Sequence, residues 1–378
     1  MKVLIIGAGI TGLTTAYNLA KMGIKDVTVV EKGYISSGSS TRNASHFRVH
    51  FWSIENSKFA IESRKILLNL AKKTGWNPVF DQSGYLWLLA SEEQLKAFKK
   101  SNEMWESLGV AGKILPIEDV KRKYPYINTE NYVAAFYGPQ DGKVHHDHVS
   151  YGYYKASLKL GVRFLENTKV EKILVKGEKV VGVETTKGKI DADTIVVAAG
   201  VWSKEILSTC NIDLPITPER KEICVTEPVK HFIGPLIIDM KTGAYVGQTV
   251  RGEIIGSIAK PEVKGLMPQI NTLVWATTWI KSITQVIPSL KYFKIMRAWS
   301  GFYNVTPDHS HILGRDPEWP EGLYVHTGYS GHGFMMSPLG GLLVAKNIIT
   351  GEIPELMRPY LPTRFKEERL IKETMVIG

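Results

Sequence analysis

The sequence contains very little cysteine: two residues in 378, Cys210 and Cys224. Two thiols cannot form a disulfide framework or a metal site by themselves, which excludes a disulfide-rich secreted scaffold and favours a reducing compartment. Long apolar runs are also missing, because no stretch approaches the ~18 residues of a membrane helix. The pattern of a buried strand starts almost at the first residue, at Val3, which leaves no room for a signal peptide. We therefore expect a soluble, cytoplasmic protein without a membrane span.

Acidic residues are fewer than basic ones, 37 against 47, which gives a formal net charge of +10 and a pI near 9.3. A basic chain can bind nucleic acid. Here, however, lysine and arginine are interspersed with glutamate, as in KVEKILVKGEKV (169–180) and RFKEERLIKE (364–373). This mixture favours a solvated surface with many ion pairs over a nucleic-acid interface. The chain of 378 residues, with 44% hydrophobic content, is long enough for about two domains.

The clearest motif is a glycine cluster directly after the first apolar run. That run, Val3 to Ile6, predicts a buried parallel strand, and Gly7, Gly9 and Gly12 then complete a GxGxxG pattern. The following segment has helix-forming composition, and DVTVVEK predicts a second strand that ends at Glu31. Glu31 follows the last glycine at about the 20-residue spacing of a ribose-binding acid. The order and spacing of these features, from the first strand through the glycines and the helix to the second strand and its acid, predict a dinucleotide-binding unit.

Each of these residue types has a physical reason. Gly7 permits a tight turn, Gly9 lets a pyrophosphate approach the backbone, and Gly12 lets the helix expected over Thr14–Lys21 pack closely on the strand. The N-terminus of that helix offers free N–H groups and the positive end of its dipole to the phosphates. Glu31 can accept both ribose hydroxyls and repels a 2′-phosphate, which argues against NADP. An ordinary βαβ turn without a ligand is the alternative, and the full register disfavours it.

The two domains are expected to be interleaved along the chain. After the dinucleotide unit, short aromatic strands mix with a polar helix; the chain then returns to helix, hairpin and a buried run ending at Gly200, before a second strand-rich region. The fold class is therefore α/β combined with α+β. The nucleotide-binding domain is expected to comprise residues 1–75, 138–214 and 301–378, and the substrate-binding domain residues 76–137 and 215–300.

Four segments far apart in the chain form a combined pattern: GAGITG (7–12) with Glu31, AAGVWS (198–203), RAWSGFYNVTPDHSHILG (297–314) and TGYSGHGF (327–334). Together they resemble the D-amino-acid oxidase and sarcosine oxidase superfamily of FAD-dependent amine oxidoreductases, which includes glycine oxidase and proline dehydrogenase beta subunits. The resemblance implies a glutathione-reductase-like, Rossmann-type FAD-binding domain interleaved with a substrate domain built on an antiparallel sheet. The flavin would lie at the junction of the two.

The glycine-rich loop near the C-terminus has an expected role in this arrangement. Ser337 and Pro338 form an N-cap and N1 pair, which predicts a helix from there to Gly351. The backbone N–H groups of Gly331, His332, Gly333, Phe334 and Met335, reinforced by the helix dipole, would stabilise negative charge on the reduced flavin. A glycine-rich helix entry without a ligand is the alternative.

The segment SSGSSTRNASHFRVHF (36–51) lies where this family wraps residues around pyrophosphate and flavin. Ser39, Ser40, Arg42 and Asn43 are candidates for phosphate and ring-edge contacts through hydroxyl, guanidinium and amide donors. Arg48 stands where sarcosine-oxidase-like relatives bind the substrate carboxylate, and an arginine fork suits a carboxylate. A surface salt bridge is the alternative for Arg48.

Departures from the family pattern change part of the expectation. Gly301 occupies the place of a cysteine that binds the flavin covalently in monomeric sarcosine oxidase, so the FAD should be non-covalent. Tyr303 occupies the place of a carboxylate-binding arginine of glycine oxidases, and Met335 that of a lysine. No counterpart of the family's oxygen-activating lysine is apparent, so the electron acceptor can be oxygen or a partner redox protein. Further expected FAD contacts are Ile10, Thr11, Lys32, Val170, Ala199, Gly200 and Trp202.

The histidines need separate treatment. HHDH (145–148) resembles a metal cluster, but Asp147 looks like a helix N-cap and adjacent residues seldom all face one ion, so no metal site is expected. His309 and His311 are expected to cap or pack. His332 and His46 lie in flavin-facing segments and could tune the flavin or position an amine. The candidate catalytic residues are therefore Arg48, His332, Tyr303 and His46.

We therefore expect an FAD enzyme that oxidises an amino acid or N-alkyl amino acid, such as sarcosine, proline or glycine, to the imine by hydride transfer to flavin N5. Two alternatives stay open. One is oxidation of a hydroxy acid or glycerol phosphate, for which a second basic residue beside Arg48 is expected. The other is a flavin-binding subunit of a larger redox complex without turnover of its own. The chain could form homo- or hetero-oligomers.

Overall fold

The structure is a computed structural model, and it describes residues 1–375. The apolar runs near the N-terminus form a six-stranded sheet in the order β19–β20–β12–β1–β2–β8, which is parallel except for β19. These strands are β1 (Lys2–Ile6), β2 (Asp26–Val30), β8 (Arg163–Leu165), β12 (Thr194–Val197), β19 (Ile312–Gly314) and β20 (Leu323–Thr327). The central strands carry continuous apolar runs because both faces of the sheet are covered.

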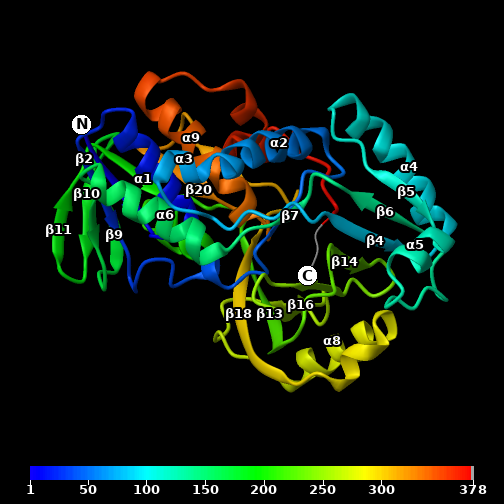
Figure 1. Ribbon diagram of the computed structural model, residues 1–378. Helices are drawn as coiled ribbons and strands as arrows, with labels where there is room; N and C mark the ends of the chain where they lie inside the picture. The colour runs from blue at the N-terminus through cyan, green and yellow to red at the C-terminus, as the bar shows by residue number, and fades with distance from the viewer. Residues whose placement is uncertain (376–378) are drawn as a thin grey trace.

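Helices cover one face of this sheet and a small sheet covers the other (Figure 1). Alternate residues of β1 divide the core: Val3 and Ile5 pack with the helices, and Leu4 and Ile6 with the small sheet. The helices on the first face are α1 (Ile10–Lys21), α2 (Ile54–Leu68) and α9 (Gly333–Thr350). The small sheet consists of β9 (Val170–Lys176), β10 (Lys179–Thr185) and β11 (Gly188–Asp191), with α7 (Ser203–Ser208) beside it.

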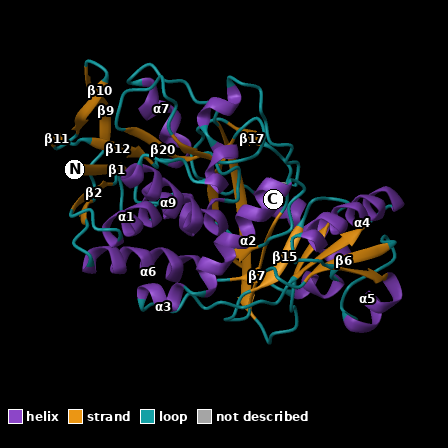
Figure 2. Cartoon of the chain, turned by 90° about the horizontal axis from the view of Figure 1, so that it is seen from above, coloured by secondary structure: helices purple, strands orange, loops and turns teal. Residues whose placement is uncertain are grey.

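A second, nine-stranded sheet stands beside this unit and is mostly antiparallel (Figure 2). Its order is β17–β13–β16–β15–β14–β4–β6–β5, and β18 pairs with β13. Among the described strands of this sheet, only β14 and β4 pair in parallel. Its strands are β4 (Tyr85–Leu89), β5 (Lys113–Pro116), β6 (Ala134–Gly138), β13 (Thr217–Pro228), β14 (Leu236–Asp239), β15 (Tyr245–Gln248), β16 (Glu253–Ser257), β17 (Val263–Lys264) and β18 (Ile295–Val305). Trp275 and Trp279 of α8 (Leu273–Val286) pack on one face of this sheet, and Phe98 and Trp105 of α4 (Glu92–Ser107) on the other.

The remaining α-helices and strands are α3 (Leu70–Thr74), α5 (Ile117–Lys123), α6 (His146–Lys159) and the short pair β3 (His46–Phe47) and β7 (Gly142–Lys143). Among them, α3 and α6 pack together beside α1, and α5 packs beside β5 and β6 of the large sheet. No helix within residues 1–375 is both long enough and apolar enough to cross a membrane.

The expected fold class is confirmed, because a parallel nucleotide-binding type of sheet and a mostly antiparallel sheet are both built from interleaved segments. The domain boundaries remain a proposal. One strand runs across the expected boundary at position 300: β18 belongs wholly to the large sheet, and it carries Gly301 and Tyr303.

Three helix starts differ from the sequence-based expectations. α1 begins at Ile10 rather than Thr14, because Gly9 is the extended N-cap and Gly12 lies inside the first turn. α9 begins at Gly333 rather than at the Ser337–Pro338 pair, so Pro338 lies inside the helix. The local capping signal is overridden because this end of α9 is packed in the protein interior, where Phe334 and Met336 are buried.

The third difference concerns the histidine-rich segment. α6 begins at His146 with His145 as its N-cap, so Asp147 lies in the first turn and is not the cap. An acid there still suits the positive end of the helix dipole. Within residues 1–375, no group of three or more His, Cys, Asp or Glu side chains is arranged to hold a metal ion.

Candidate active site

A cavity of about 690 Å³ lies between the two sheets. That volume is within the range of small-molecule and cofactor sites. Its wall contains almost every residue singled out in the sequence: Gly7, Gly9, Ile10, Thr11, Glu31, Lys32, Ser39, Ser40, Arg42, Asn43, His46, Arg48, Val170, Ala199, Gly200, Trp202, Gly301, Tyr303, Gly331, His332, Gly333, Phe334 and Met335. Segments that are far apart in the sequence, such as those around Gly7 and Met335, therefore meet at one site.

The exception is Gly12, which does not line this cavity. A Cβ atom at Gly12 would lie 1.9 Å from the carbonyl oxygen of Gly7 and 3.3 Å from Ile5 Cγ2. Gly12 therefore permits the close contact between α1 and β1, and its contribution to a cofactor site is indirect. Gly7 itself has φ +106°, a conformation that favours glycine.

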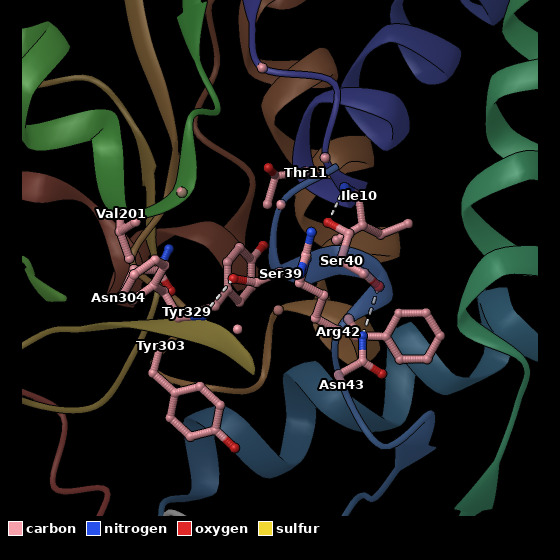
Figure 3. A pocket seen from close by; sticks show the side chains of 18 of the residues that line it. Ile10, Thr11, Ser39, Ser40, Arg42, Asn43, Val201, Tyr303, Asn304 and Tyr329 are labelled. Carbon is pink, nitrogen blue, oxygen red and sulfur yellow. Dashed lines mark hydrogen bonds between the residues drawn. The ribbon is translucent and has the colours of Figure 1, made fainter. Parts of the chain in front are cut away.

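The N-terminus of α1 is suited to an anion. Gly9 is its N-cap and has no side chain that could accept from the first turn, as Ser or Asp would. The N–H of Ile10 donates to Ser40 Oγ at 2.8 Å, which brings the 36–48 segment against the helix end. Figure 3 shows Ser40 directed toward Ile10, with Tyr303 projecting from β18 in another part of the pocket. N–H groups at a helix end with a positive dipole favour phosphate.

Glu31 follows β2 at the cavity wall, and its carboxylate is held by backbone donors. The N–H of Ala8 donates to Oε2 at 2.9 Å and that of Gly33 to Oε1 at 2.8 Å. Beside it, the Lys32 ammonium lies 3.2 Å from the ring centroid of Trp202. An anchored carboxylate with acceptor capacity left is suited to two vicinal hydroxyl groups.

The 36–48 segment is tied to the large sheet at β18. The N–H of Phe302 donates to Ser39 Oγ at 2.8 Å, and a Cβ atom at Gly301 would lie 3.2 Å from the carbonyl oxygen of Arg42. Asn43 Nδ2 donates to the Ser40 carbonyl at 2.7 Å, so this amide shapes the segment itself. The two sheets therefore meet at fixed points along the cavity.

The glycine-rich loop closes another side of the cavity. Gly331 has φ +97°, and a Cβ atom there would lie 2.5 Å from the ring of Tyr303, so the loop backbone packs directly on that ring. Because α9 begins at Gly333 with His332 as its N-cap, the positive end of the helix lies in the cavity wall. This is one turn closer to the loop than the Ser337–Pro338 pair predicted.

Arg48 is the most informative residue of the site. Its side chain is buried, with 2% of the residue exposed, so the alternative of a surface salt bridge is wrong. Nη2 lies 3.2 Å from His332 Nε2 and donates to the carbonyl of Met375, whereas Nε and Nη1 have no hydrogen-bond partner among the described residues. The guanidinium carbon also lies 4.3 Å from the ring centroid of Phe51. A buried cation with unused donors at a cavity wall is suited to an anionic ligand.

Three other titratable groups in the cavity wall, His46, His332 and Tyr303, are held in their neutral forms. Burial, together with the nearby Lys143 cation, lowers the pKa of His46 to about 3. Burial and the Arg48 charge lower the pKa of His332 well below its usual value. Burial raises the pKa of Tyr303 to about 12, so its hydroxyl is protonated near pH 7. This end of the cavity therefore combines one fixed positive charge with neutral polar groups.

Sequence reasoning missed several residues of the wall, of which Lys221 is the most notable. Lys221 comes from β13 and is a further cation in the cavity wall, in addition to Lys32, Arg42 and Arg48. Its Nζ lies 2.6 Å from Glu219 Oε1 and 3.1 Å from the Ala259 carbonyl, so its charge is already neutralised. Other residues of the wall that were not foreseen are Tyr85, Tyr245, Ser257, Gln269, Asn304 and Tyr329. Because alternate side chains of a strand point to opposite faces of the sheet, Lys221 belongs to one of two sets along β13. No sequence pattern indicated which of the two faces lines the cavity.

Two further side chains lie outside this site. His311 is buried between Tyr329 and Tyr360, with ring centroids 4.6 and 3.8 Å away, which confirms its packing role. Arg251 is exposed, pairs with Glu253 at 3.2 Å and does not line the cavity, so it is not placed to bind a carboxylate there.

Comparison with known proteins agrees with the geometry. The family model described as FAD dependent oxidoreductase matches residues 2–347. The chain belongs to this family. It is therefore an FAD-dependent oxidoreductase, as the sequence motifs led us to expect.

Individual relatives of this oxidoreductase cover nearly the whole chain. The beta subunit of sarcosine oxidase from Rhodobacter capsulatus is 27% identical, over 100% of this chain and 91% of its own. The crystal structure of L-proline dehydrogenase from P. horikoshii is 33% identical with a TM-score of 0.92, over 98% of each chain. Glycine oxidase from Bacillus cereus is 25% identical with a TM-score of 0.84, over 94% of this chain and 97% of its own.

Proposed function

We propose that this oxidoreductase oxidises an amino acid or N-alkyl amino acid, of the proline, sarcosine or glycine type, to its imine. The observation that carries the proposal is Arg48, a buried guanidinium at the cavity wall with donors that no described residue uses. A substrate carboxylate would supply the missing acceptors, and it would offset the cost of burying the charge. The names of the relatives, which specify sarcosine, L-proline and glycine, support the same substrate class.

The residues of the cavity fit a non-covalently bound FAD. The N-terminus of α1 and Ser40 would hold the pyrophosphate, and Glu31 the ribose. Neither Cys210 nor Cys224 lines the cavity, and Gly301 has no side chain to form a bond with the cofactor. The bound FAD would supply a hydride acceptor at its N5 position.

The protein's own groups would bind and orient the amino acid. Arg48 would hold the carboxylate, and Tyr303, which is protonated near pH 7, lies in the same cavity wall and would help to orient the substrate. The Arg48 charge and the neutral state of His46 and His332 would favour the unprotonated amine over its ammonium form. Loss of a hydride from the carbon next to the amine nitrogen leaves an iminium ion, which releases its N–H proton to solvent to give the imine. Water then hydrolyses the imine to a carbonyl group and an amine.

The alternative of hydroxy-acid or glycerol-phosphate oxidation required a second free basic residue near Arg48. Lys221 is the additional cation on the large-sheet side of the cavity, and its pairing with Glu219 at 2.6 Å makes it a poor partner for a phosphate. Amino-acid oxidation is therefore favoured.

The electron acceptor and the assembly are a separate part of the proposal. Relatives include both a dehydrogenase and oxidases, and three curated relatives are named as beta subunits. We propose that this chain works with a second subunit and passes electrons to oxygen or to a redox partner.

The test is anaerobic mixing of the purified protein with proline, sarcosine and glycine, and in parallel with lactate and glycerol 3-phosphate. We expect an amino acid to bleach the flavin absorbance at about 450 nm, whereas lactate and glycerol 3-phosphate leave it unchanged. Bleaching by the hydroxy compounds alone would replace the proposal with the alternative, and no bleaching by any of them would support a flavin-binding subunit without turnover. Acid precipitation should leave the yellow colour in the supernatant, whereas a yellow pellet would refute non-covalent attachment. Readmitting oxygen or adding a dye to the bleached sample identifies the acceptor.

A further inference from the structure

The last described segment of the chain, Ile371–Met375, runs through the interior rather than over the surface. Ile371, Glu373 and Met375 are buried, and the side chains between them, Lys372 and Thr374, are exposed. Ile371 packs in the core beside the helices of the six-stranded sheet, whereas Met375 packs against the nine-stranded sheet. A segment near the end of a chain in which every second side chain is buried is held in place by specific contacts.

Glu373 anchors this segment to the start of α2. Its carboxylate accepts from the backbone N–H groups of Trp52 at 3.3 Å and Ser53 at 3.1 Å, from Ser53 Oγ at 2.9 Å and from Asn56 Nδ2 at 3.3 Å. It also accepts from the N–H of Met375 at 2.8 Å, which fixes the turn of the segment itself. A carboxylate with this number of donors is held firmly, because each donor bonds to it and the positive end of the helix dipole attracts its oxygens.

The anchored segment ends in a contact with Arg48. The Met375 carbonyl accepts from Arg48 Nη2, the same nitrogen that lies 3.2 Å from His332 Nε2. Phe51 lies in the loop between Arg48 and α2. The guanidinium carbon of Arg48 lies over the Phe51 ring, 4.3 Å from its centroid. With Nη2 held from one side and the aromatic ring beneath, Nε and Nη1 are the nitrogens left for a ligand.

We propose that the segment Ile371–Met375 positions Arg48 for the carboxylate of the substrate, with Glu373 as the anchor and the Met375 carbonyl as the contact. The inference rests on the proposed function, in which Arg48 binds that carboxylate. An arginine side chain has several rotatable bonds, so a guanidinium that is fixed before the ligand arrives loses less entropy on binding. Glu373 is therefore a positioning residue: it acts through Arg48 and lies outside the cavity wall.

The experiment compares two substitutions in the same segment. Glu373→Gln replaces one carboxylate oxygen by an amide nitrogen, which donates and cannot accept from the N–H groups of Trp52 and Ser53. The hydrogen bonds that hold the segment to α2 are therefore weakened. Lys372→Ala, the matched control, removes an exposed side chain one position away. Each variant is assayed with an amino acid and with the amine that lacks its carboxylate, for example proline and pyrrolidine. A second readout is the dissociation constant of acetate, followed by the absorption change of the bound FAD without turnover.

For Glu373→Gln we expect the preference for proline over pyrrolidine, measured as a ratio of kcat/KM, to fall by about tenfold, mainly through KM. Acetate binding should weaken by a similar factor, while turnover of pyrrolidine and the FAD content stay unchanged. Lys372→Ala should match the wild type in all these measurements. If Glu373→Gln lowers the activity on both substrates equally and keeps the preference, Glu373 is only structural and the inference is overturned.

Arg48→Ala separates this inference from the proposed function. If Arg48→Ala keeps the preference for the carboxylate, both ideas fail together. If Arg48→Ala loses it and Glu373→Gln keeps it, the proposed function stands and only the positioning role is refuted. In the double variant, Glu373→Gln should cause no further loss, because it acts through Arg48. Should Glu373→Gln not fold, Ser53→Ala removes one anchoring bond without altering the segment, and it should give a smaller shift in the same direction; an unchanged preference there would refute the inference.

Discussion

Replacement of Arg48 is the most direct test of how this site binds its substrate. Arg48→Ala removes a guanidinium whose Nε and Nη1 have no partner among the described residues, so the loss falls mainly on the ligand. A hydrogen bond to a charged group contributes about 1.5–3 kcal/mol. At about 1.4 kcal/mol per factor of ten, kcat/KM for an amino acid should fall by one to two orders of magnitude. The protein should still fold, because the substitution also removes a buried charge that is costly to desolvate.

The assay is a comparison of proline with pyrrolidine, or of another amino acid with the matching amine. The wild type should strongly prefer the acid, and Arg48→Ala should nearly lose this preference while its FAD content stays the same. Arg48→Lys should recover part of the preference, because an ammonium keeps the charge but not the planar set of donors. Arg64→Ala is the control: Arg64 is also an arginine with a buried part, but it donates to the Gln140 carbonyl at 2.8 Å and does not line the cavity.

The reasoning would be refuted by an Arg48→Ala variant that retains the full preference for the acid. The carboxylate would then be held elsewhere, and Tyr303 would be the next candidate because its protonated hydroxyl lies in the same cavity wall. An equal loss of activity with proline and pyrrolidine would point instead to damage of the site as a whole.

Three other predictions follow from the same geometry. Gly12→Ala should abolish the yellow holoprotein, because its Cβ would lie 1.9 Å from the Gly7 carbonyl oxygen. The control is Gly23→Ala, whose Cβ faces open space and which should cost only about 1 kcal/mol of backbone strain. A Gly12→Ala protein that still binds FAD would contradict this packing. Glu31→Ala should raise the FAD dissociation constant by about tenfold or more in a fluorescence titration, and an unchanged value would remove its ribose role. Between pH 5 and 8, kcat/KM should rise with pH as the substrate amine loses its proton. The lowered pKa of His332 keeps that group neutral over this range, so it should add no break to the profile. A break near pH 6.5 that disappears in His332→Gln would show that His332 titrates in this range and would refute the prediction.

The sequence by itself determined the parts of this protein that depend on short-range spacing. Gly7, Gly9 and Glu31 could be placed at one site because a strand, a turn and a helix of fixed geometry leave little choice about where these residues lie. The same holds for the glycine-rich loop, whose composition indicated a close backbone approach. The family pattern then predicted both the cofactor and the fold class, which the sheets and the family match confirm.

The start of α9 shows the limit of local signals. Ser337 and Pro338 form a good capping pair, yet the helix begins at Gly333. Capping contributes about 1 kcal/mol, and the burial of side chains such as Phe334 and Met336 contributes more. The position of the helix end at the cavity was therefore decided by packing.

Only the tertiary structure decided the electrostatics of the site. Arg48 and Met375 are 327 positions apart, and no local pattern could have shown that the Met375 carbonyl holds this guanidinium. Lys221 is a cation in the cavity wall, but Glu219 on the same strand neutralises it. Spacing predicts which residues belong to an element, whereas the pKa of a group, its partners and its free donors depend on what packs against it in three dimensions.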